Sequence, residues 1–214
     1  MCRFYAEQIF HHPRLRNLTY YMRMDTDSFI MKPLCYDPIE HIHRRNRVYA
    51  YNRITPDAGY AVEEMWNFID KYARSHPGVE DQLRRNKWPW PPDRDLWIEK
   101  GIKYDGIGVP AYSNNFEIVK LESFRRRDVV QFIKEIMRDP AHIYSLRWGM
   151  CVPFLQYSMT DSSCLLHSWL GDAPIRGATV NMFFDLEKDV ERMCAMEYWH
   201  QGLVPADCKC IPEQ

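Results

Sequence analysis

The sequence lacks a long apolar run, and none of its hydrophobic stretches approaches the roughly 18 residues that a membrane-spanning helix needs. At its start it also lacks the charged and apolar regions of a signal peptide. An excess of one charge is missing too, because 28 lysines and arginines face 29 aspartates and glutamates, for a formal net charge of -1. Domains that bind nucleic acid usually carry a clear basic excess, so we predict no nucleic-acid partner.

Cysteine pairs at the spacing of a zinc site are absent as well. The seven cysteines are irregularly spaced, and an odd number leaves at least one of them unpaired within the chain. Cys208 and Cys210 are predicted to be either one end of a disulfide or two free thiols, rather than a metal clamp. The pattern leaves the redox compartment open.

Apolar and aromatic side chains are plentiful: 46% of the residues are hydrophobic and 14% are aromatic. This composition excludes a disordered chain and provides for a sizeable core. Apolar spacing predicts helices over residues 2–10, 62–75, 124–139 and 186–199, and short strands over 20–24 and 48–51. Ser123 is the predicted N-cap of the third of these helices. Short strands mixed with helices predict an α/β or α+β layered domain.

Two aspartates, Asp25 and Asp27, directly follow the predicted strand over residues 20–24. Carboxylates two residues apart in a tight loop can turn toward one cation, and hard oxygen ligands suit Mg²⁺ or Mn²⁺. A divalent ion there could hold a diphosphate and stabilise its charge as it leaves. The alternative is a solvated turn in which an aspartate caps the backbone.

Three further polar residues stand in apolar or aromatic surroundings. Glu117 lies between Phe116 and Ile118 and could act as nucleophile or base near an anomeric carbon, or be a surface residue of an amphipathic strand. Asp172 could accept hydrogen bonds from sugar hydroxyls, or simply begin a turn. His200 could be a third Mn²⁺ ligand, or a structural or exposed histidine.

Taken in order along the chain, these segments resemble one family. The matching motifs are Met1-Cys2-Arg3-Phe4, His12-Pro13, Tyr20-Tyr21-x-Arg23-x-Asp25-x-Asp27, Tyr36-Asp37-Pro38, Asn115-Phe116-Glu117-Ile118, Gly171-Asp172-Ala173-Pro174 and Tyr198-Trp199-His200. They cover most of residues 1–210 with divergent stretches between them. The set is similar to the fungal-type glycolipid and glycoprotein α-1,2-mannosyltransferases, glycosyltransferase family 15.

The resemblance implies a partial GT-A-type α/β fold, that of nucleotide-diphospho-sugar transferases, with a mixed sheet flanked by helices. It implies a GDP-mannose donor, Mn²⁺ as cofactor, and a retaining transfer that forms an α-1,2 linkage to a mannose-terminated glycan acceptor. The sequence leaves open whether the acceptor glycan is N-linked, O-linked or lipid-linked. Family members are type II membrane proteins that act on the lumenal side of the Golgi membrane.

The resemblance also assigns roles to individual residues. It places the catalytic role on Glu117, which either forms a glycosyl-enzyme or stabilises an oxocarbenium ion. The metal ligands it implies are Asp25, Asp27 and His200, and the substrate-binding residues are Arg23, Asn115 and Asp172. Asp25 departs from the pattern, because the family usually has a glutamate followed by proline there, so the carboxylate has a shorter reach.

Two other departures concern the extent of the chain. Residues 1–214 are expected to form a single catalytic domain that lacks the upstream part of the nucleotide-binding half and the membrane anchor of the intact protein. Residues 149–169 are a predicted insertion, because the family usually runs from Arg-Trp-Gly into Asp-Ala-Pro without a break. The alternative function is a non-catalytic truncated relative that acts as a carbohydrate-binding or scaffold module.

Overall fold

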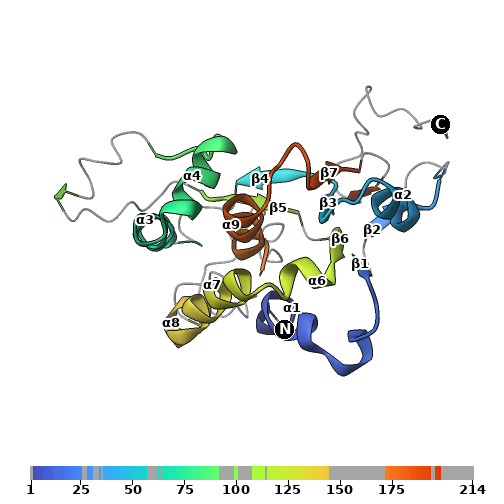
Figure 1. Cartoon of the computed structure of the whole chain (residues 1–214), viewed down its shortest axis with the longest axis horizontal. Helices are drawn as coiled ribbons and strands as arrows, with labels where there is room; N and C mark the ends of the chain where they lie inside the picture. The colour runs from blue at the N-terminus through green and yellow to red at the C-terminus, as the bar shows by residue number, and fades with distance from the viewer. Residues whose placement is uncertain are drawn as a thin grey trace, which may run out of the picture.

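The fold is known from a computed structural model, which describes residues 2–25, 28–30, 34, 36–56, 62, 64–91, 99–100, 108–113, 115–144, 172–193 and 196–198 (Figure 1). The helices are α1 Cys2–Ala6, α2 Pro38–Arg44, α3 Met65–Ser75, α4 Pro77–Arg85, α6 Leu121–Phe124, α7 Arg127–Arg138, α8 Pro140–Tyr144 and α9 Ala173–Phe183, with 3-10 helices η1 Gln8–His11 and η2 Pro13–Leu15. The strands are β1 Tyr20–Met24, β2 Ser28–Ile30, β3 Tyr49–Tyr51, β4 Ile54–Pro56, β5 Pro110–Tyr112, β6 Phe116–Lys120, β7 Val190–Arg192 and β8 Met196–Tyr198. The predicted insertion over 149–169, Asp27 and His200 lie outside the described residues.

The central sheet has four strands in the order β1-β6-β3-β7. It is mixed, because β3 pairs in parallel with β7 while β6 pairs antiparallel with both β1 and β3. The register sets Arg23 of β1 directly opposite Glu117 of β6. Two small antiparallel sheets, β2-β8 and β4-β5, complete the strand pairing of the described residues.

Side chains alternate between the two faces of the central sheet, as the pleat requires. Tyr21, Tyr49 and Val119 belong to the larger of two buried apolar clusters, on the face toward α9. Ala50 and Ile118 belong to the smaller cluster on the opposite face, which is closed by Ile42 of α2. Both faces of the sheet are therefore covered by helices, in agreement with the predicted fold class.

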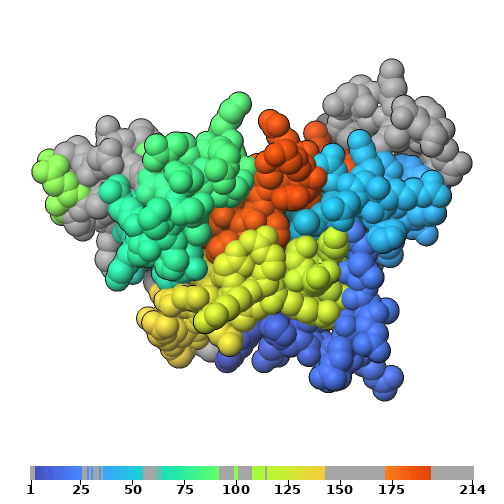
Figure 2. Space-filling model, in the orientation of Figure 1, coloured from blue at the N-terminus to red at the C-terminus, as the bar shows by residue number. Residues whose placement is uncertain are grey.

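Helix α9 runs through the middle of the molecule, and its residues from Ala173 to Met182 are all buried. It contacts β5, α4 and α7, and in Figure 2 its orange segment is partly covered by the neighbouring segments. Gly177 lets it approach β5 closely, because a Cβ at this position would lie 2.2 Å from the carbonyl oxygen of Pro110. Apolar spacing does not predict α9, because a helix buried on all sides has no polar face and no amphipathic period.

Several local predictions are confirmed. The strands over 20–24 and 48–51 correspond to β1 and β3, and the helices over 62–75 and 124–139 correspond to α3 and α7. In α7 four of the six predicted apolar positions are buried, namely Val129, Phe132, Ile133 and Ile136, while Val130 and Met137 are half-buried. The segment over 2–10 is split into α1 and η1. Within the described part of the chain, every helix falls short of the length and apolar character that crossing a bilayer demands.

Two local predictions are wrong. Ser123 is not an N-cap: it lies inside α6, and α7 begins only after Arg126, whose φ of -56° and ψ of 144° break the helix. The helix over 186–199 is replaced by a turn and two strands. Hydrogen bonds join Asp185 and Asp189 across the turn, after which β7 pairs with β3 and β8 with β2. Pairing with strands that are distant in sequence has overridden the local apolar spacing.

Candidate functional site

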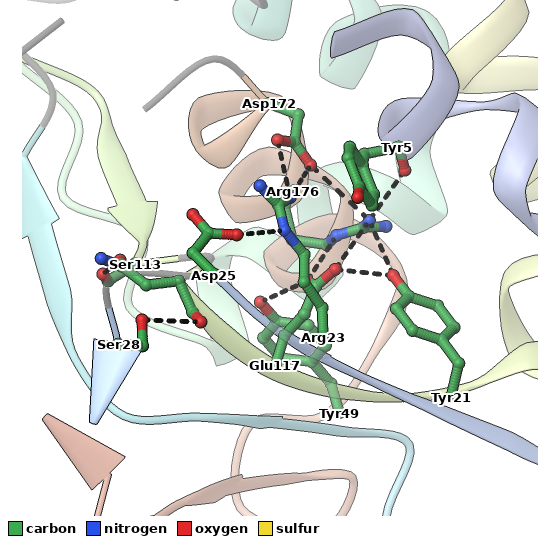
Figure 3. A network of polar contacts seen from close by, with 11 residues as sticks. Tyr5, Tyr21, Arg23, Asp25, Ser28, Tyr49, Ser113, Glu117, Asp172 and Arg176 are labelled. Carbon is green, nitrogen blue, oxygen red and sulfur yellow. Dashed lines mark hydrogen bonds and ion pairs between the residues drawn. The ribbon is translucent and has the colours of Figure 1, made fainter. Parts of the chain in front are cut away.

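Glu117 is the buried centre of a polar network between β1, β6 and α9 (Figure 3). Its side chain is 0% exposed. The hydroxyl of Tyr21 donates to Oε1 at 2.6 Å, and that of Tyr49 donates to Oε2 at 3.2 Å. Arg176 donates from Nε to Oε2 at 3.1 Å and from Nη2 to Oε1 at 3.4 Å. Both carboxylate oxygens are thus engaged by hydrogen-bond donors, one of them a guanidinium.

Arg176 is a functional candidate that the sequence analysis missed. Its side chain is 2% exposed, and it also donates to the backbone carbonyl of Tyr5 at 3.0 Å. Its guanidinium lies 4.9 Å from the ring centroid of Phe10 and 5.0 Å from that of Phe124. The sequence did contain a signal for it: Arg176 stands four residues after Asp172 and is the one charged residue between Asp172 and Asp185. An arginine inside an apolar run usually has a buried acidic partner.

Arg23 holds two carboxylates from different parts of the chain. Its Nη1 donates to Asp172 at 3.1 Å, and its Nε donates to Asp25 at 3.0 Å. Burial by itself lowers the pKa of Arg23, but the carboxylates of Asp172, Glu117 and Asp25 raise it above its ordinary value. Burial raises the pKa of Asp172, and the charge of Arg23 opposes that shift. Arg23 and Asp172 therefore bind each other, whatever they do toward substrate.

Five side chains of alternating sign form a continuous series, which we call the charge chain: Glu117, Arg176, Asp172, Arg23 and Asp25. Arg176 lies 3.9 Å from Asp172 and links the two halves. Three carboxylates against two guanidinium groups leave one surplus negative charge when all are ionised. Side-chain exposure rises from 0% at Glu117 to 11% at Arg23 and 32% at Asp25. Of the five side chains, the carboxylate of Asp25 is therefore the most exposed to solvent.

Asn115 fixes the turn that carries Asp25. Its backbone carbonyl accepts from the backbone N–H of Asp25 at 2.8 Å and from the hydroxyl of Ser28 at 3.3 Å. The N–H of Ser28 in turn donates to the carbonyl of Asp25 at 2.9 Å, which closes the turn. Ser113 hydrogen-bonds to the side chain of Asn115. The predicted role of Asn115 in binding substrate stays a prediction.

The strand that follows Asp25 in the sequence and the strand that precedes His200 are neighbours in space. Ser28 of β2 pairs with Tyr198 of β8, two residues before His200. The predicted metal ligands Asp27 and His200 themselves lie outside the described residues, so of the three ligands only Asp25 is placed. Across the residues that the structure describes, no three histidine, cysteine or acidic side chains gather to hold an ion. The ligand set stays a prediction, with Asp25 as its placed member.

Tyr21 and Tyr49 make stability sensitive to alkaline pH. Burial, followed by the negative charge of Glu117, raises the pKa of both well above the ordinary value of about 10. Above pH 10 the unfolded chain loses these protons while the folded chain keeps them, so the free energy of unfolding falls as pH rises. The expected slope is up to about 1.4 kcal/mol per pH unit for each tyrosine. Urea unfolding from pH 9 to 11 should show a flatter slope for Tyr49→Phe, and equal slopes would contradict the prediction.

Comparison with known proteins gives consistent matches. The family model for glycolipid 2-alpha-mannosyltransferase matches residues 1–162. The probable mannosyltransferase KTR4 of Saccharomyces cerevisiae is 22% identical over 185 residues, which are 86% of this chain and 34% of that protein. The O-glycoside alpha-1,2-mannosyltransferase homolog 2 of Schizosaccharomyces pombe is 22% identical over 218 residues, 100% of this chain and 50% of the relative. The chain thus spans half the length of these relatives or less.

Two solved structures share the fold. Core-mannan synthase A of Aspergillus fumigatus, in a Mn/GDP form, has a TM-score of 0.65 at 20% identity and covers 94% of this chain and 47% of its own. Ktr4p of S. cerevisiae, in complex with GDP, has a TM-score of 0.67 at 19% identity, with 98% and 48% covered. These matches confirm the predicted fold class of a mixed sheet flanked by helices.

Proposed function

The chain belongs to the glycolipid 2-alpha-mannosyltransferase family, and from that premise we propose that it transfers mannose from GDP-mannose to a mannose-terminated glycan, forming an α-1,2 linkage with retention at the anomeric carbon. Relatives named as α-1,2-mannosyltransferases and related structures named for bound Mn and GDP support the proposal. By the same family resemblance, we propose that the protein acts at the lumenal side of the Golgi membrane.

One observation carries the proposal: the charge chain ends at a partly exposed Asp25, on a turn that Asn115 anchors beside β8. The two guanidinium groups balance Glu117 and Asp172, so the surplus negative charge of the charge chain corresponds to Asp25, and a partly exposed carboxylate suits a hard divalent cation. Asp25 fits as one ligand of Mn²⁺, and we propose Asp27 and His200 as the others. The ion would neutralise the charge of the departing GDP.

For Glu117 the contacts bear on the two roles that the sequence left open. A nucleophile needs a lone pair that can reach the anomeric carbon. Both oxygens of Glu117 already accept hydrogen bonds, and the side chain is 0% exposed. Attack on the sugar would require one oxygen to leave Tyr21 or Arg176. The contacts therefore favour a role through the negative charge of Glu117 over bond formation, and the nucleophile stays a prediction.

The proposal is tested with the 214-residue chain, GDP-[¹⁴C]mannose, Mn²⁺ and methyl α-mannoside. We expect labelled dimannoside, its loss on chelation, and its return when Mn²⁺ is added back. Loss of a residue that only supports a metal ligand typically lowers activity roughly 10- to 100-fold. Asp25→Ala removes a proposed ligand itself, so we expect the transfer rate to fall by at least that much. Asp81→Ala, which alters an exposed aspartate on α4, is the matched control and should leave the rate unchanged.

A thermal-shift measurement separates the enzyme from the carbohydrate-binding or scaffold alternative. A donor site that binds GDP with Mn²⁺ stabilises the folded chain by an amount that grows with the logarithm of the ligand concentration above Kd, and so raises its melting temperature. We expect such a rise for the unaltered chain and little or none for Asp25→Ala. An unaltered melting temperature at saturating GDP and Mn²⁺, together with no labelled product, would reject the transferase and favour the non-catalytic alternative.

A further inference from the structure

Arg23 uses different nitrogens for its two acidic partners. Nε donates to Asp25 at 3.0 Å, while Nη1 lies 3.1 and 3.3 Å from the two oxygens of Asp172. A guanidinium is planar and rigid, so these two contacts fix the position of one carboxylate relative to the other. Because Asp172 precedes α9 and Asp25 follows β1, Arg23 joins the start of the central helix to the end of an edge strand.

The guanidinium is itself held from several sides. It lies 4.0 Å from the ring centroid of Tyr5, and its side chain is only 11% exposed. Its partner Asp172 is 4% exposed and stands beside the buried Arg176. Tyr5 and the buried Asp172 thus hold the guanidinium of Arg23 in place, while its Nε contacts the more exposed Asp25. This arrangement is suited to orienting a carboxylate.

We propose that Arg23 is a positioning residue for Asp25: it fixes the carboxylate through one oxygen before a divalent cation arrives, and so raises the affinity for that cation. The inference rests on the proposed function, which makes Asp25 a Mn²⁺ ligand. It differs from the sequence prediction, in which Arg23 binds substrate. A substrate-binding arginine affects the affinity for the sugar donor, whereas a positioning residue affects the affinity for the metal.

Arg23→Lys separates charge from geometry. Lysine keeps the positive charge between Asp25 and Asp172, but a single ammonium lacks the rigid fork that places two nitrogens on two carboxylates. The test is to measure free Mn²⁺ by electron paramagnetic resonance while the chain is titrated at saturating GDP. The melting temperature of each variant without ligand shows whether it is folded. Loss of an orienting partner should weaken Mn²⁺ binding roughly 10- to 100-fold. Arg14→Lys, at an exposed arginine of η2, is the control and should bind Mn²⁺ as the unaltered chain does.

Tyr5→Leu gives a second and milder test if Arg23→Lys does not fold. It removes the ring beside the guanidinium and leaves the ion pairs of Arg23 in place. A cation–π contact of about 0.5–1 kcal/mol corresponds to a roughly 2- to 5-fold weakening of Mn²⁺ binding when it is lost. Unchanged affinity in the folded variants, or a raised KM for GDP-mannose with unchanged Mn²⁺ affinity, would overturn the positioning role.

The two levels of the proposal fail in different ways. If the unaltered chain itself binds no Mn²⁺ at saturating GDP, the proposed cation site is wrong, and the role of Arg23 falls with it. If the unaltered chain binds Mn²⁺ and the Arg23 and Tyr5 variants bind it equally well, the proposed function stands and only the positioning role is rejected. The Mn²⁺ signal does not depend on turnover, so activity is not needed to distinguish these results.

Discussion

Replacing Glu117 by alanine is expected to lower the free energy of unfolding by about 3–5 kcal/mol, because it leaves the Arg176 guanidinium buried without its main partner. Arg176 is 2% exposed, and its two contacts with Glu117 are at 3.1 and 3.4 Å. Tyr21 and Tyr49 lose their acceptor in the same variant. Urea unfolding at neutral pH measures the change.

Two further variants show whether the ion pair is the cause. Glu122→Ala removes an exposed glutamate on the neighbouring helix α6 and should change stability by no more than about 0.5 kcal/mol. The double variant Glu117→Leu with Arg176→Met removes both charges while roughly keeping volume, and such replacements are often neutral or stabilising. We expect it to recover most of the loss. A double variant as unstable as the sum of its single changes would show that the pair is not coupled.

This stability effect bears on any catalytic test of Glu117. Loss of activity in Glu117→Ala would not separate a missing nucleophile from a partly unfolded site. Glu117→Gln keeps the side chain's size and an acceptor oxygen, so it is the better variant for the transfer assay, run below its melting temperature. Labelled dimannoside formed by folded Glu117→Gln at the unaltered rate would remove Glu117 from the chemical step.

The second large effect is expected at Gly177. An added Cβ would lie 2.2 Å from the carbonyl oxygen of Pro110 and 3.2 Å from the Cα of Ala111, both in the backbone of β5. Backbone cannot swing aside as a flexible side chain can, so Gly177→Ala should push α9 away from β5. Overpacking of this kind typically costs about 1–3 kcal/mol and sometimes more. For a chain of this size that is a fall in melting temperature of roughly 2–12 °C.

Gly78 supplies the matched control. It lies in the first turn of α4, and a Cβ there would meet no atom within 4 Å. Gly78→Ala should therefore leave the melting temperature unchanged or raise it slightly, because alanine loses less backbone entropy in a helix than glycine.

Since Gly177 follows Arg176 directly, Gly177→Ala should also weaken Mn²⁺ binding. If Gly177→Ala had the same melting temperature as the unaltered chain, α9 and β5 would not be in tight contact.

Local sequence patterns were sufficient for the half-buried helices α3 and α7, although they did not identify the shorter half-buried helices α2 and α4. The apolar stripe of α7 and the apolar positions of α3 identified these helices, since one face of each packs on the core while the other meets solvent. The strand before Asp25 was identified differently, from a short apolar and aromatic run that ends in acidic residues, and the family motifs singled out Arg23, Glu117 and Asp172. Periodicity carries this information because burial of one face imposes it.

The tertiary structure decided what lies beyond any local window. The segment after Asp185 forms strands although its apolar spacing fits a helix, because it completes sheets with β3 and β2. Helix α9 is covered on every side and so shows no amphipathic pattern. Arg176 belongs to the charge chain only because α9 lies against β6 and β1. Composition, fold class and motif residues followed from the sequence alone, whereas the partners of each charge were fixed by long-range packing, which sets distances that sequence spacing does not contain.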